Sequence, residues 1–222
     1  MKIATYNLNG IRSAINKDWL SWIKKTDFDV ICVQELKAQP DQLDLIEYGC
    51  GNPDFDKEGR VIRADFGDIS VFSIYFPSGT TGDIRQSVKY VFLDFILDYL
   101  KEIKKKRKKL IVCGDYNIAN NAIDIHDPIG NKNSSGFLIE ERTWLDKFWE
   151  TGFIDSLRHF NKEPHQYTWR SFRANARANN KGWRIDYIAI TKNLVAQLKS
   201  AVIMPEALHS DHCPMVIELD LG

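Results

Sequence analysis

The sequence lacks a charge excess, a cysteine framework and any long hydrophobic run. Its 30 basic and 30 acidic residues cancel, so a nucleic-acid partner needs a local basic face on the protein. The four cysteines show no C-x-x-C spacing. Cys32 and Cys113 lie in apolar runs, which predicts buried thiols and a reducing compartment. No apolar stretch is long enough to span a membrane, and Met1 leads directly into a strand pattern, which predicts no secretory signal.

The composition does supply a hydrophobic core. Hydrophobic residues make up 44% of the chain, which includes six Trp and twelve Phe. A length of 222 residues fits one large domain, which we expect to span 1–222.

The hydrophobic periodicity predicts a mixed α/β chain. Strands are expected at 2–8, 29–33, 59–65, 69–76, 110–113, 183–191 and 215–221. Helices are expected at 15–25, 40–46, 88–103 and 137–149, with a helical turn or two at 193–198. We interpret 48–58 as loop and the long polar segment 120–136 as functional. Many strands without strict alternation predict two sheets packed face to face with helices outside.

The strand at 110–113 ends in an unusual way. After Gly114 it presents Asp115 and Asn117, whose side chains lie on the same side of an extended chain. One can accept a proton from a water molecule while the other donates a hydrogen bond to it. Asp and Asn also serve as turn residues, and this stretch alone favours neither interpretation.

Polar groups stand at the ends of several other strands. The set comprises Asn7, Glu35, Tyr75, Asp115 with Asn117, Asp186, and Asp211 with His212. If the strand ends share one edge, the carboxylates repel one another unless a divalent cation lies between them. Oxygen ligands without a cysteine cluster favour Mg²⁺ or Mn²⁺ over Zn²⁺. Such a site is typical of phosphodiester hydrolysis by water.

Other interpretations of these residues are weaker. Each one alone has an ordinary explanation, such as a turn cap or a surface acid, but the set needs a separate explanation for every member. A Ser-His-Asp hydrolase is a poor alternative, because Ser210 directly precedes Asp211 and His212 and no nucleophile-elbow motif is present.

The segment 168–184 has the composition of a nucleic-acid contact. It contains Arg170, Arg173, Arg177, Lys181 and Arg184 and no acidic residue. Three aromatic residues, Trp169, Phe172 and Trp183, lie among them. Basic groups bind phosphates and aromatic rings pack against sugars or bases, which predicts DNA contact. The alternative is a solvated loop that carries core aromatics.

Nine motifs, in order over nearly the whole chain, carry a family resemblance. They are Tyr6-Asn-Leu-Asn-Gly-Ile-Arg12, Gln34-Glu-Leu-Lys37, Glu58-Gly-Arg-Val-Ile62, Tyr75-Phe-Pro-Ser-Gly79, Gly114-Asp-Tyr-Asn-Ile118, Gly130-Asn-Lys132, Asn175-Ala-Arg177, Gly182-Trp-Arg-Ile-Asp-Tyr187 and Ser210-Asp-His-Cys-Pro214. The chain resembles the exonuclease III family of apurinic/apyrimidinic endonucleases, within the endonuclease/exonuclease/phosphatase superfamily. The resemblance implies a deoxyribonuclease I-like, four-layer α/β sandwich, in which helices flank two packed mixed β-sheets.

The resemblance implies a role for each site residue. Glu35 is expected to be the principal metal carboxylate. Asn7 and Asp211 are expected to support the metal, Asp211 through water. The implied cofactor is Mg²⁺, for which Mn²⁺ can substitute.

The same resemblance implies the catalytic roles. Asp115, beside Asn117, is expected to hold or deprotonate the attacking water. His212 is expected to contact the scissile phosphate while Asp186 orients its ring. Tyr75 is expected to hydrogen-bond the phosphate or the leaving oxygen. The identity of the general base stays open.

On the DNA side, Trp169, Trp183 and Ile185 match residues that form the pocket for a flipped-out abasic deoxyribose. Flipping costs least where the base is already missing. Arg173 is expected to enter the duplex as a wedge. The other implied DNA contacts are Arg12, Lys37, Asn131, Lys132, Asn175 and Arg177.

The chain departs from the family pattern in two places. Asn9 stands where some members carry an Asp that also ligates metal. The segment 38–57 is much shorter than in the family and lacks a hairpin that grips the DNA backbone. We therefore expect a shortened first sheet with an exposed edge and weaker duplex binding. Alternatively, a stretch of the protein is missing from this sequence, which would also make the segment 38–57 short.

Together these observations predict a Mg²⁺-dependent DNA repair phosphodiesterase. It is expected to cleave 5′ to abasic sites by one in-line water attack, with 3′→5′ exonuclease or 3′-phosphodiesterase activity in addition. One alternative is a DNA-binding member whose catalysis is reduced or lost through the short 38–57 segment. Another is a superfamily phosphatase acting on a non-DNA phosphoester, which the segment 168–184 argues against. The expected partner is double-stranded DNA containing abasic sites. The protein is expected to be a cytoplasmic, bacterial-type monomer that does not bind membranes.

Overall fold

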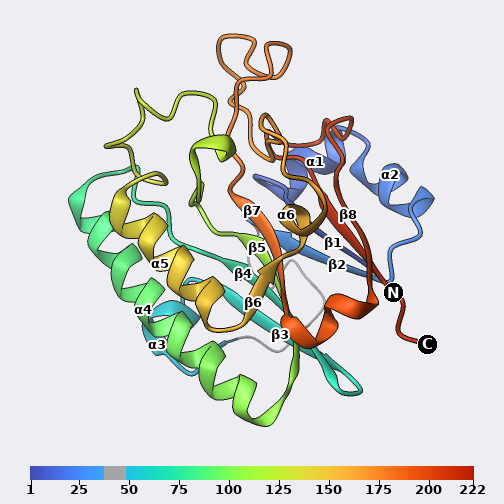
Figure 1. Ribbon diagram of the computed structural model, residues 1–222. Coiled ribbons are helices and arrows are strands. Elements are labelled where there is room, and N and C mark those ends of the chain that lie inside the picture. Colours follow the sequence, from blue (N-terminus) through green and yellow to red (C-terminus); the bar gives the residue numbers. More distant parts are fainter. Residues whose placement is uncertain (38–48) are drawn as a thin grey trace.

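The computed structural model describes residues 1–37 and 49–222, whose strands form two sheets (Figure 1). The first has the order β2 (Val30–Gln34), β1 (Lys2–Asn7), β9 (Met215–Leu219) and β8 (Leu198–Ile203). The second has the order β3 (Val61–Phe66), β4 (Ile69–Tyr75), β5 (Lys109–Asp115), β7 (Asp186–Thr191) and β6 (Phe153–Asp155). Both sheets are mixed, because β1–β2 and β4–β5 pair in parallel while β1–β9 and β5–β7 pair antiparallel.

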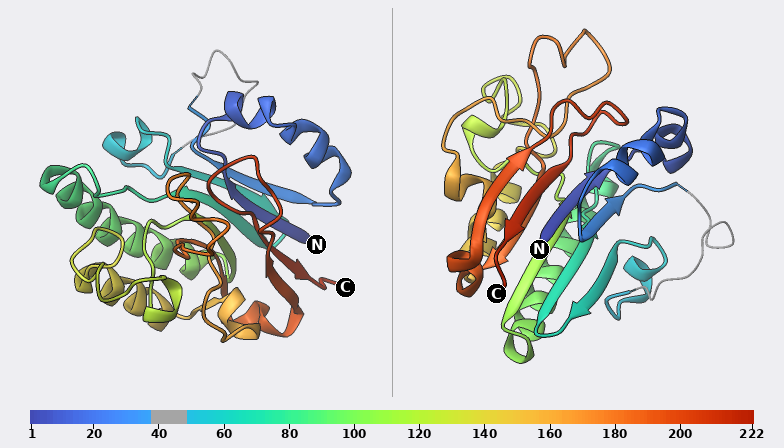
Figure 2. Two further views of the ribbon diagram at one scale, coloured as in Figure 1. Left: turned by 90° about the horizontal axis from the view of Figure 1, so that it is seen from above. Right: turned by 90° about the vertical axis from the view of Figure 1, so that its right-hand side faces the viewer.

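Helices cover the outer face of each sheet, which gives the four layers expected from the sequence (Figure 2). On the first sheet they are α1 (Ile11–Asn16) and α2 (Trp19–Lys25), and on the second α4 (Asp83–Lys106) and α5 (Ile139–Glu150). Shorter elements are α3 (Pro53–Asp56), α6 (Ser156–Phe160) and the 3₁₀ turns η2 (Ala122–Asp124) and η3 (Lys192–Gln197). No helix in these two described stretches combines the length and apolar character that crossing a membrane requires.

The apolar run in β5 results from burial on both of its faces. Ile111 and Cys113 point between the sheets, where they join the cluster that includes Ile3. The alternating residues Leu110 and Val112 belong to the cluster under α4 and α5. Each fully buried aliphatic side chain of this kind contributes about 1.5–3 kcal/mol. The core therefore fixes the end of β5, and with it Asp115, in one position.

The structure confirms the expected buried thiols. Cys32 and Cys113 are both free and buried, one in each sheet. Both lie in the core cluster between the sheets.

Some local predictions were wrong. The expected helix 15–25 is split into α1 and α2, because Asp18 adopts a left-handed conformation at φ 67°. The expected loop 48–58 contains α3, whose N-cap Asn52 accepts a hydrogen bond from Asp54 N at 3.0 Å. The expected strand 183–191 begins only at Asp186, and the sequence analysis missed β8 altogether.

The first sheet has four strands in the described residues and the second has five. A shortened first sheet was expected from the short segment 38–57. Residues 38–48, including the helix expected at 40–46, lie outside the described part of the chain.

Candidate active site

Strand register brings three polar residues into one row. Tyr75 pairs with Asp115 across β4 and β5, and Asp115 pairs with Asp186 across β5 and β7. Because β7 runs antiparallel to β5, Asp186 begins its strand, whereas the sequence analysis expected a strand end. Asp211 and His212 likewise precede β9, which runs antiparallel to β1. The expected convergence at one edge is therefore reached through both strand directions.

A cleft with a volume of about 760 Å³ opens at this edge. Nine of the residues selected from the sequence line it: Glu35, Tyr75, Asp115, Asn117, Trp169, Trp183, Ile185, Asp211 and His212. Asn7 and Asp186 lie directly behind its surface as hydrogen-bond partners of lining residues. The sequence analysis missed several small polar lining residues, namely Ser78, Thr80, Gln86, Asn133, Ser134 and Ser135. Their only signals were the Pro-Ser-Gly turn after β4 and the long polar segment 120–136.

Asn7 holds two carboxylates at a fixed spacing. Its Nδ2 donates to Glu35 Oε1 at 2.7 Å and to Asp115 Oδ2 at 2.9 Å. Its Oδ1 accepts from the backbone N–H of Asn9 at 2.9 Å. The side chain is fully buried at the end of β1, so packing against the sheet orients the amide.

Asp115 is buried at the floor of the cleft. Its Oδ1 accepts from the backbone N–H of Asn117 at 2.8 Å, and Asn117 itself adopts a left-handed conformation at φ 52°. The Asn117 carboxamide donates to the carbonyl oxygen of Phe76 at 2.9 Å, which fixes its orientation. Burial and the charge of Asp186 raise the pKa of Asp115 to about 7, against the opposing influence of His212.

His212 and Asp186 form a buried pair. His212 Nδ1 lies 2.9 Å from Asp186 Oδ2. Burial lowers the pKa of His212, but the charge and hydrogen bond of Asp186 outweigh it and raise the pKa to about 9. The imidazole is therefore positively charged at neutral pH. The other oxygen of Asp186, Oδ1, is buried with no hydrogen-bond partner in the described residues.

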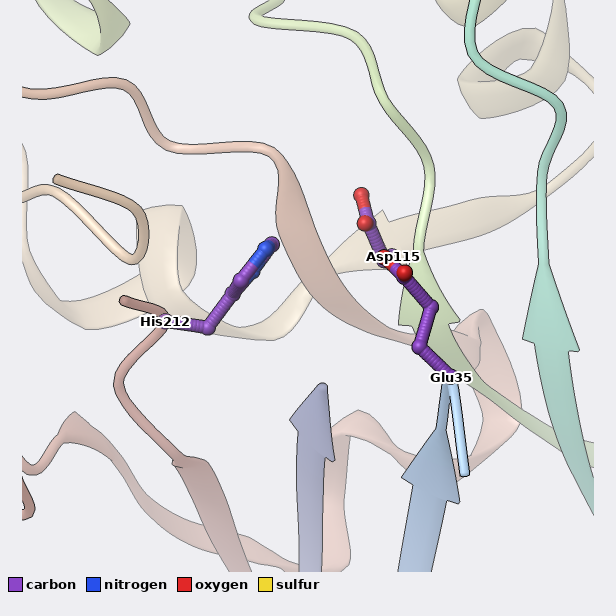
Figure 3. A group of neighbouring side chains, drawn as sticks. All are labelled: Glu35, Asp115 and His212. Carbon is purple, nitrogen blue, oxygen red and sulfur yellow. The ribbon is translucent and has the colours of Figure 1, made fainter. Parts of the chain in front are cut away.

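The donor set fits a divalent cation. Glu35, Asp115 and His212 each offer a ligand atom, and these atoms all lie within 4.8 Å of one another. In Figure 3 the imidazole of His212 points toward the two carboxylates from the opposite side. Because His212 is protonated at neutral pH, the carboxylates are the candidate cation ligands, and oxygen donors without a thiolate favour Mg²⁺ or Mn²⁺ over Zn²⁺. The unpartnered Oδ1 of Asp186 adds further negative potential beside this group.

Asp211 lies beside this group with both oxygens already hydrogen-bonded. Its Oδ1 accepts from Asn9 Nδ2 at 3.0 Å and its Oδ2 accepts from Trp169 Nε1 at 3.0 Å. Burial raises the pKa of Asp211, but His212 and these hydrogen-bond donors lower it by more, so the net shift is downward. Asp211 is therefore an anion at neutral pH. Its bonding supports the site from the side of the aromatic wall.

Asn9 links two charged groups of the site. Its Nδ2 donates to Asp211 and its Oδ1 accepts from Lys37 Nζ, which also lies 3.2 Å from Glu35 Oε2. A carboxylate at position 9 would lose the hydrogen bond to Asp211 and repel it instead. The amide is thus matched to its neighbours at the position where some family members have Asp.

Trp169, Trp183 and Ile185 form one wall of the cleft. The two indole rings meet edge to face at 6.5 Å, and backbone bridges join Trp169 to Trp183 and to His212. Ile185 packs in the same small apolar cluster. The structure therefore brings these three apolar residues into the same cleft as Asp115 and His212.

The basic segment 168–184 only partly faces solvent. Arg184 is fully buried and its Nε lies 2.7 Å from Asp124 Oδ1, while Arg170 is buried against Asn180 and Cys213. The expectation that these two arginines contact phosphates was wrong, because buried acceptors already pair them. Arg173 is exposed.

The other predicted DNA contacts do not line the cleft. Arg12, Lys37, Lys132 and Asn175 are exposed and Asn131 is half-buried. Arg177 is half-buried and donates to the carbonyl oxygens of Pro205 at 2.8 Å and Ser210 at 3.0 Å. Through these bonds Arg177 holds the loop that carries Asp211 and His212.

Comparison with known proteins agrees with this fold and site. The family described as the endonuclease/exonuclease/phosphatase family matches residues 4–212. An exodeoxyribonuclease of Bacillus subtilis is 35% identical over 253 aligned positions, covering 100% of both chains. The DNA repair nuclease APEX1 of Danio rerio is 32% identical over 99% of this chain and 82% of its own. The structure of an AP endonuclease from Archaeoglobus fulgidus superposes with a TM-score of 0.91 at 27% identity, covering 100% of both chains.

The B. subtilis alignment is longer than this chain, so it opens gaps in the present sequence. These matches span the chain and point to the same family as the fold and the cluster of acids and imidazole. The chain belongs to the exonuclease III and AP endonuclease branch of the endonuclease/exonuclease/phosphatase family.

Proposed function

We propose that the protein is a Mg²⁺-dependent DNA repair phosphodiesterase that incises double-stranded DNA on the 5′ side of abasic sites. One observation carries the proposal: the cluster of Glu35, Asp115 and His212 shares a single cleft with the wall formed by Trp169 and Trp183. The cluster supplies phosphodiester hydrolysis and the wall supplies an apolar surface against which a base-free sugar packs. Relatives named exodeoxyribonuclease and DNA repair nuclease support the assignment to DNA.

Glu35 would hold the cation as the principal carboxylate, with Asn7 orienting it and Asp211 supporting the site from the Trp169 side. Mg²⁺ is the cation we assign, and Mn²⁺ can replace it. Bound there, it supplies Lewis-acid stabilisation of the charge that develops on the phosphoryl oxygens. His212, held by Asp186 in its charged form, stabilises the same charge by direct contact.

Asp115 and Asn117 position the attacking water. A carboxyl group with a pKa of about 7 is suited to accept a proton at neutral pH. The water oxygen then forms the new bond to phosphorus and the bond from phosphorus to the 3′ oxygen breaks. Burial and the nearby charges of Asp115 and Glu35 raise the pKa of Tyr75, so its hydroxyl stays protonated and donates a hydrogen bond to the leaving oxygen.

Abasic sites are recognised by the pocket wall. Trp169, Trp183 and Ile185 accept a flipped-out deoxyribose, and a sugar without a base costs least to flip. Arg173 enters the duplex as a wedge next to it. Phosphates on one duplex bound per monomer are contacted by four exposed residues and the half-buried Asn131; the exposed residues are Arg12, Lys37, Lys132 and Asn175.

A nicking assay tests the proposal. The substrate is a duplex with one tetrahydrofuran abasic analogue, and the matched control is the same duplex with an intact base. We expect Mg²⁺-dependent incision 5′ to the analogue, loss of incision in EDTA, and far slower cleavage of the control. Tight binding without incision would instead identify a DNA-binding protein. Release of phosphate from a non-DNA phosphoester would identify a phosphatase.

A second candidate activity is 3′→5′ exonuclease or 3′-phosphodiesterase action in the same cleft. The observation that favours it is the full-length match to an exodeoxyribonuclease. A 3′-recessed duplex and a duplex with a blocked 3′ end, assayed beside the abasic substrate, rank these activities. If the 3′-recessed duplex is degraded as fast as the abasic duplex is nicked, exonuclease action ranks first.

A further inference from the structure

A lysine and a glutamate are buried together behind the active site. Lys89 of α4 and Glu141 of α5 are both fully buried, and Lys89 Nζ lies 2.6 Å from Glu141 Oε1. Removing two charges from water costs more than such a pair commonly regains, so the pair is weak as a source of stability alone. Its position in the core of a nuclease therefore needs another explanation.

Lys89 also holds the turn that carries the catalytic carboxamide. Its Nζ donates to the backbone carbonyl oxygen of Asn117 at 2.8 Å. Asn117 is in a left-handed conformation that non-glycine residues rarely adopt, so this peptide needs outside support. In the described residues its backbone N–H and carboxamide bond to Asp115 and Phe76, which leaves Lys89 to hold the carbonyl side.

Glu141 connects the same lysine to the opposite wall of the cleft. Its Oε2 accepts from the backbone N–H groups of Gly136 at 2.6 Å and Leu138 at 3.0 Å. Its Oε1 accepts from Gln86 Nε2 at 3.0 Å and from Ser135 Oγ at 3.4 Å, in addition to Lys89. Except for Lys89, all of these partners line the cleft.

The turn and the wall also touch directly. Gly136 adopts φ +94°, and a Cβ built on it would lie 3.1 Å from the carbonyl oxygen of Asn117. Its own carbonyl oxygen accepts from the backbone N–H of Ala119 at 2.8 Å. A shift of the 134–138 wall therefore moves the Asn117 turn, and the buried pair fixes both.

We propose that Lys89 and Glu141 are positioning residues, which hold Asn117 and the 134–138 wall of the cleft in register with Asp115. The inference rests on the proposed nuclease function and deepens it. Neither side chain touches the substrate, because both are fully buried behind the lining residues. Their contribution is to the placement of the attacking water, where a displacement of about 1 Å costs on the order of 100-fold in rate.

The test compares Lys89→Met and Glu141→Gln with Lys101→Met, an exposed lysine on the same helix whose one ion pair among residues 1–37 and 49–222 is with Asp98. In the abasic-duplex assay we expect kcat of the first two variants to fall about 10- to 100-fold with KM unchanged, because the wall stays assembled but misaligned. Lys101→Met retains wild-type kcat. The double variant Lys89→Met/Glu141→Gln is expected to lose less than the product of the two single losses, because the two side chains share the contact between Lys89 and Glu141.

A second readout does not depend on cleavage. Amide hydrogen exchange at Asn117, Gly136 and Leu138 is expected to accelerate in both core variants and to stay slow in Lys101→Met. Wild-type kcat in folded variants, unchanged exchange at these amides, or a kcat loss that only follows the folded fraction would overturn the inference. If a variant fails to fold, the inference is tested on the wild-type protein. Hydrogen exchange at these three amides by local opening, before global unfolding, would overturn the inference.

The two proposals fail in different ways. A wild-type protein that does not nick abasic DNA defeats the proposed function, and the exchange measurement still tests the hold of Lys89 on Asn117. A wild-type protein that nicks, together with core variants that nick equally fast, defeats only the positioning role.

Discussion

Asp186 Oδ2 lies 2.9 Å from Nδ1 of His212, and the two side chains are almost completely buried. The pair converts a histidine into a fixed cation at neutral pH, because its pKa rises from 6.5 to about 9. The charge therefore points into the cleft across the whole physiological pH range.

Asp186→Asn is expected to lower the pKa of His212 and to reduce kcat about 10²- to 10³-fold at pH 7.5, because the charge stabilising the phosphoryl oxygens is lost. NMR titration of the imidazoles in EDTA measures the shift. His209, which contacts Tyr6 and Trp22, is the internal control and keeps its own titration. Because the folded pKa of His212 lies above its unfolded value, the pair stabilises the protein fully below pH 6.5. This stability is lost as the pH rises through about 9. An unshifted His212 in Asp186→Asn would contradict the assignment.

Asp124→Asn is expected to destabilise the fold by about 3–5 kcal/mol at pH 7, because it leaves the buried Arg158 guanidinium without its counter-charge and Arg184 with Asp155 alone. Asp124 Oδ1 lies 2.7 Å from Arg184 Nε and 2.6 Å from Arg158 Nη2. Urea unfolding measures the loss. The exposed Asp98→Asn is the matched control and is expected to change stability by less than about 0.5 kcal/mol.

The contacts of Asp124 with Arg158 and Arg184 also make the free energy of unfolding depend on pH. Burial raises the pKa of Asp124, but the two arginines outweigh it and lower the pKa below 3.8. The stabilisation is therefore present above pH 3.8 and is lost as the pH falls through the folded pKa. We expect the gap between wild type and Asp124→Asn to narrow in acid, and a constant gap would refute the pairing.

Two substitutions at Trp169 separate metal support from substrate binding. Trp169→Phe keeps an aromatic wall and removes only the indole hydrogen bond to Asp211, which is worth about 1.5–3 kcal/mol with a charged acceptor. We expect the Mg²⁺ concentration needed for half-maximal nicking to rise while kcat at saturating Mg²⁺ stays near wild type. Trp169→Ala also removes the wall and is expected to raise KM for the abasic duplex. Identical behaviour of the two variants would show that the hydrogen bond has no part in metal support.

Arg173→Ala is expected to weaken DNA binding and to reduce the slope of log K against log salt by about one. Arg173 is exposed on the segment beside the cleft, whereas Arg184 of the same segment is buried. Fluorescence anisotropy over a salt series measures the slope on a catalytically silent complex in EDTA. Lys101→Ala on α4 serves as the surface control, with no change in slope.

The sequence predicted the layers and most strands because each strand has a two-sided apolar pattern or ends at a distinct turn. Asp115, Asp186 and His212 were found because polar groups at strand ends are costly without a function. The left-handed Asp18 was not foreseen, because the preference of Asp for this conformation is too weak to locate a helix break from sequence. Packing beyond the residue itself decides it.

Buried charges were the main error of prediction. Arg184 was interpreted as a phosphate contact because its partner Asp124 lies 60 positions away in the sequence. Lys89 did have a signal, since it lies at i, i+3 and i+7 with Phe92 and Ile96 on the buried face of α4. Its partner Glu141 stands on another helix, and only the tertiary structure joins the two.

The pairing of β1 with β9 has a consequence for the time at which the protein becomes active. Asn7 ends β1, and His212 enters just before β9, so the catalytic group closes only when segments more than two hundred residues apart have met. Non-local pairing of this kind slows folding. During synthesis, Asp115 and Glu35 emerge long before His212, so a nascent chain carries these acidic groups without the imidazole that completes the cluster. Under the proposed function, cleavage is acquired only at this last step, and recovery of nicking after dilution from urea reports completed folding rather than early collapse.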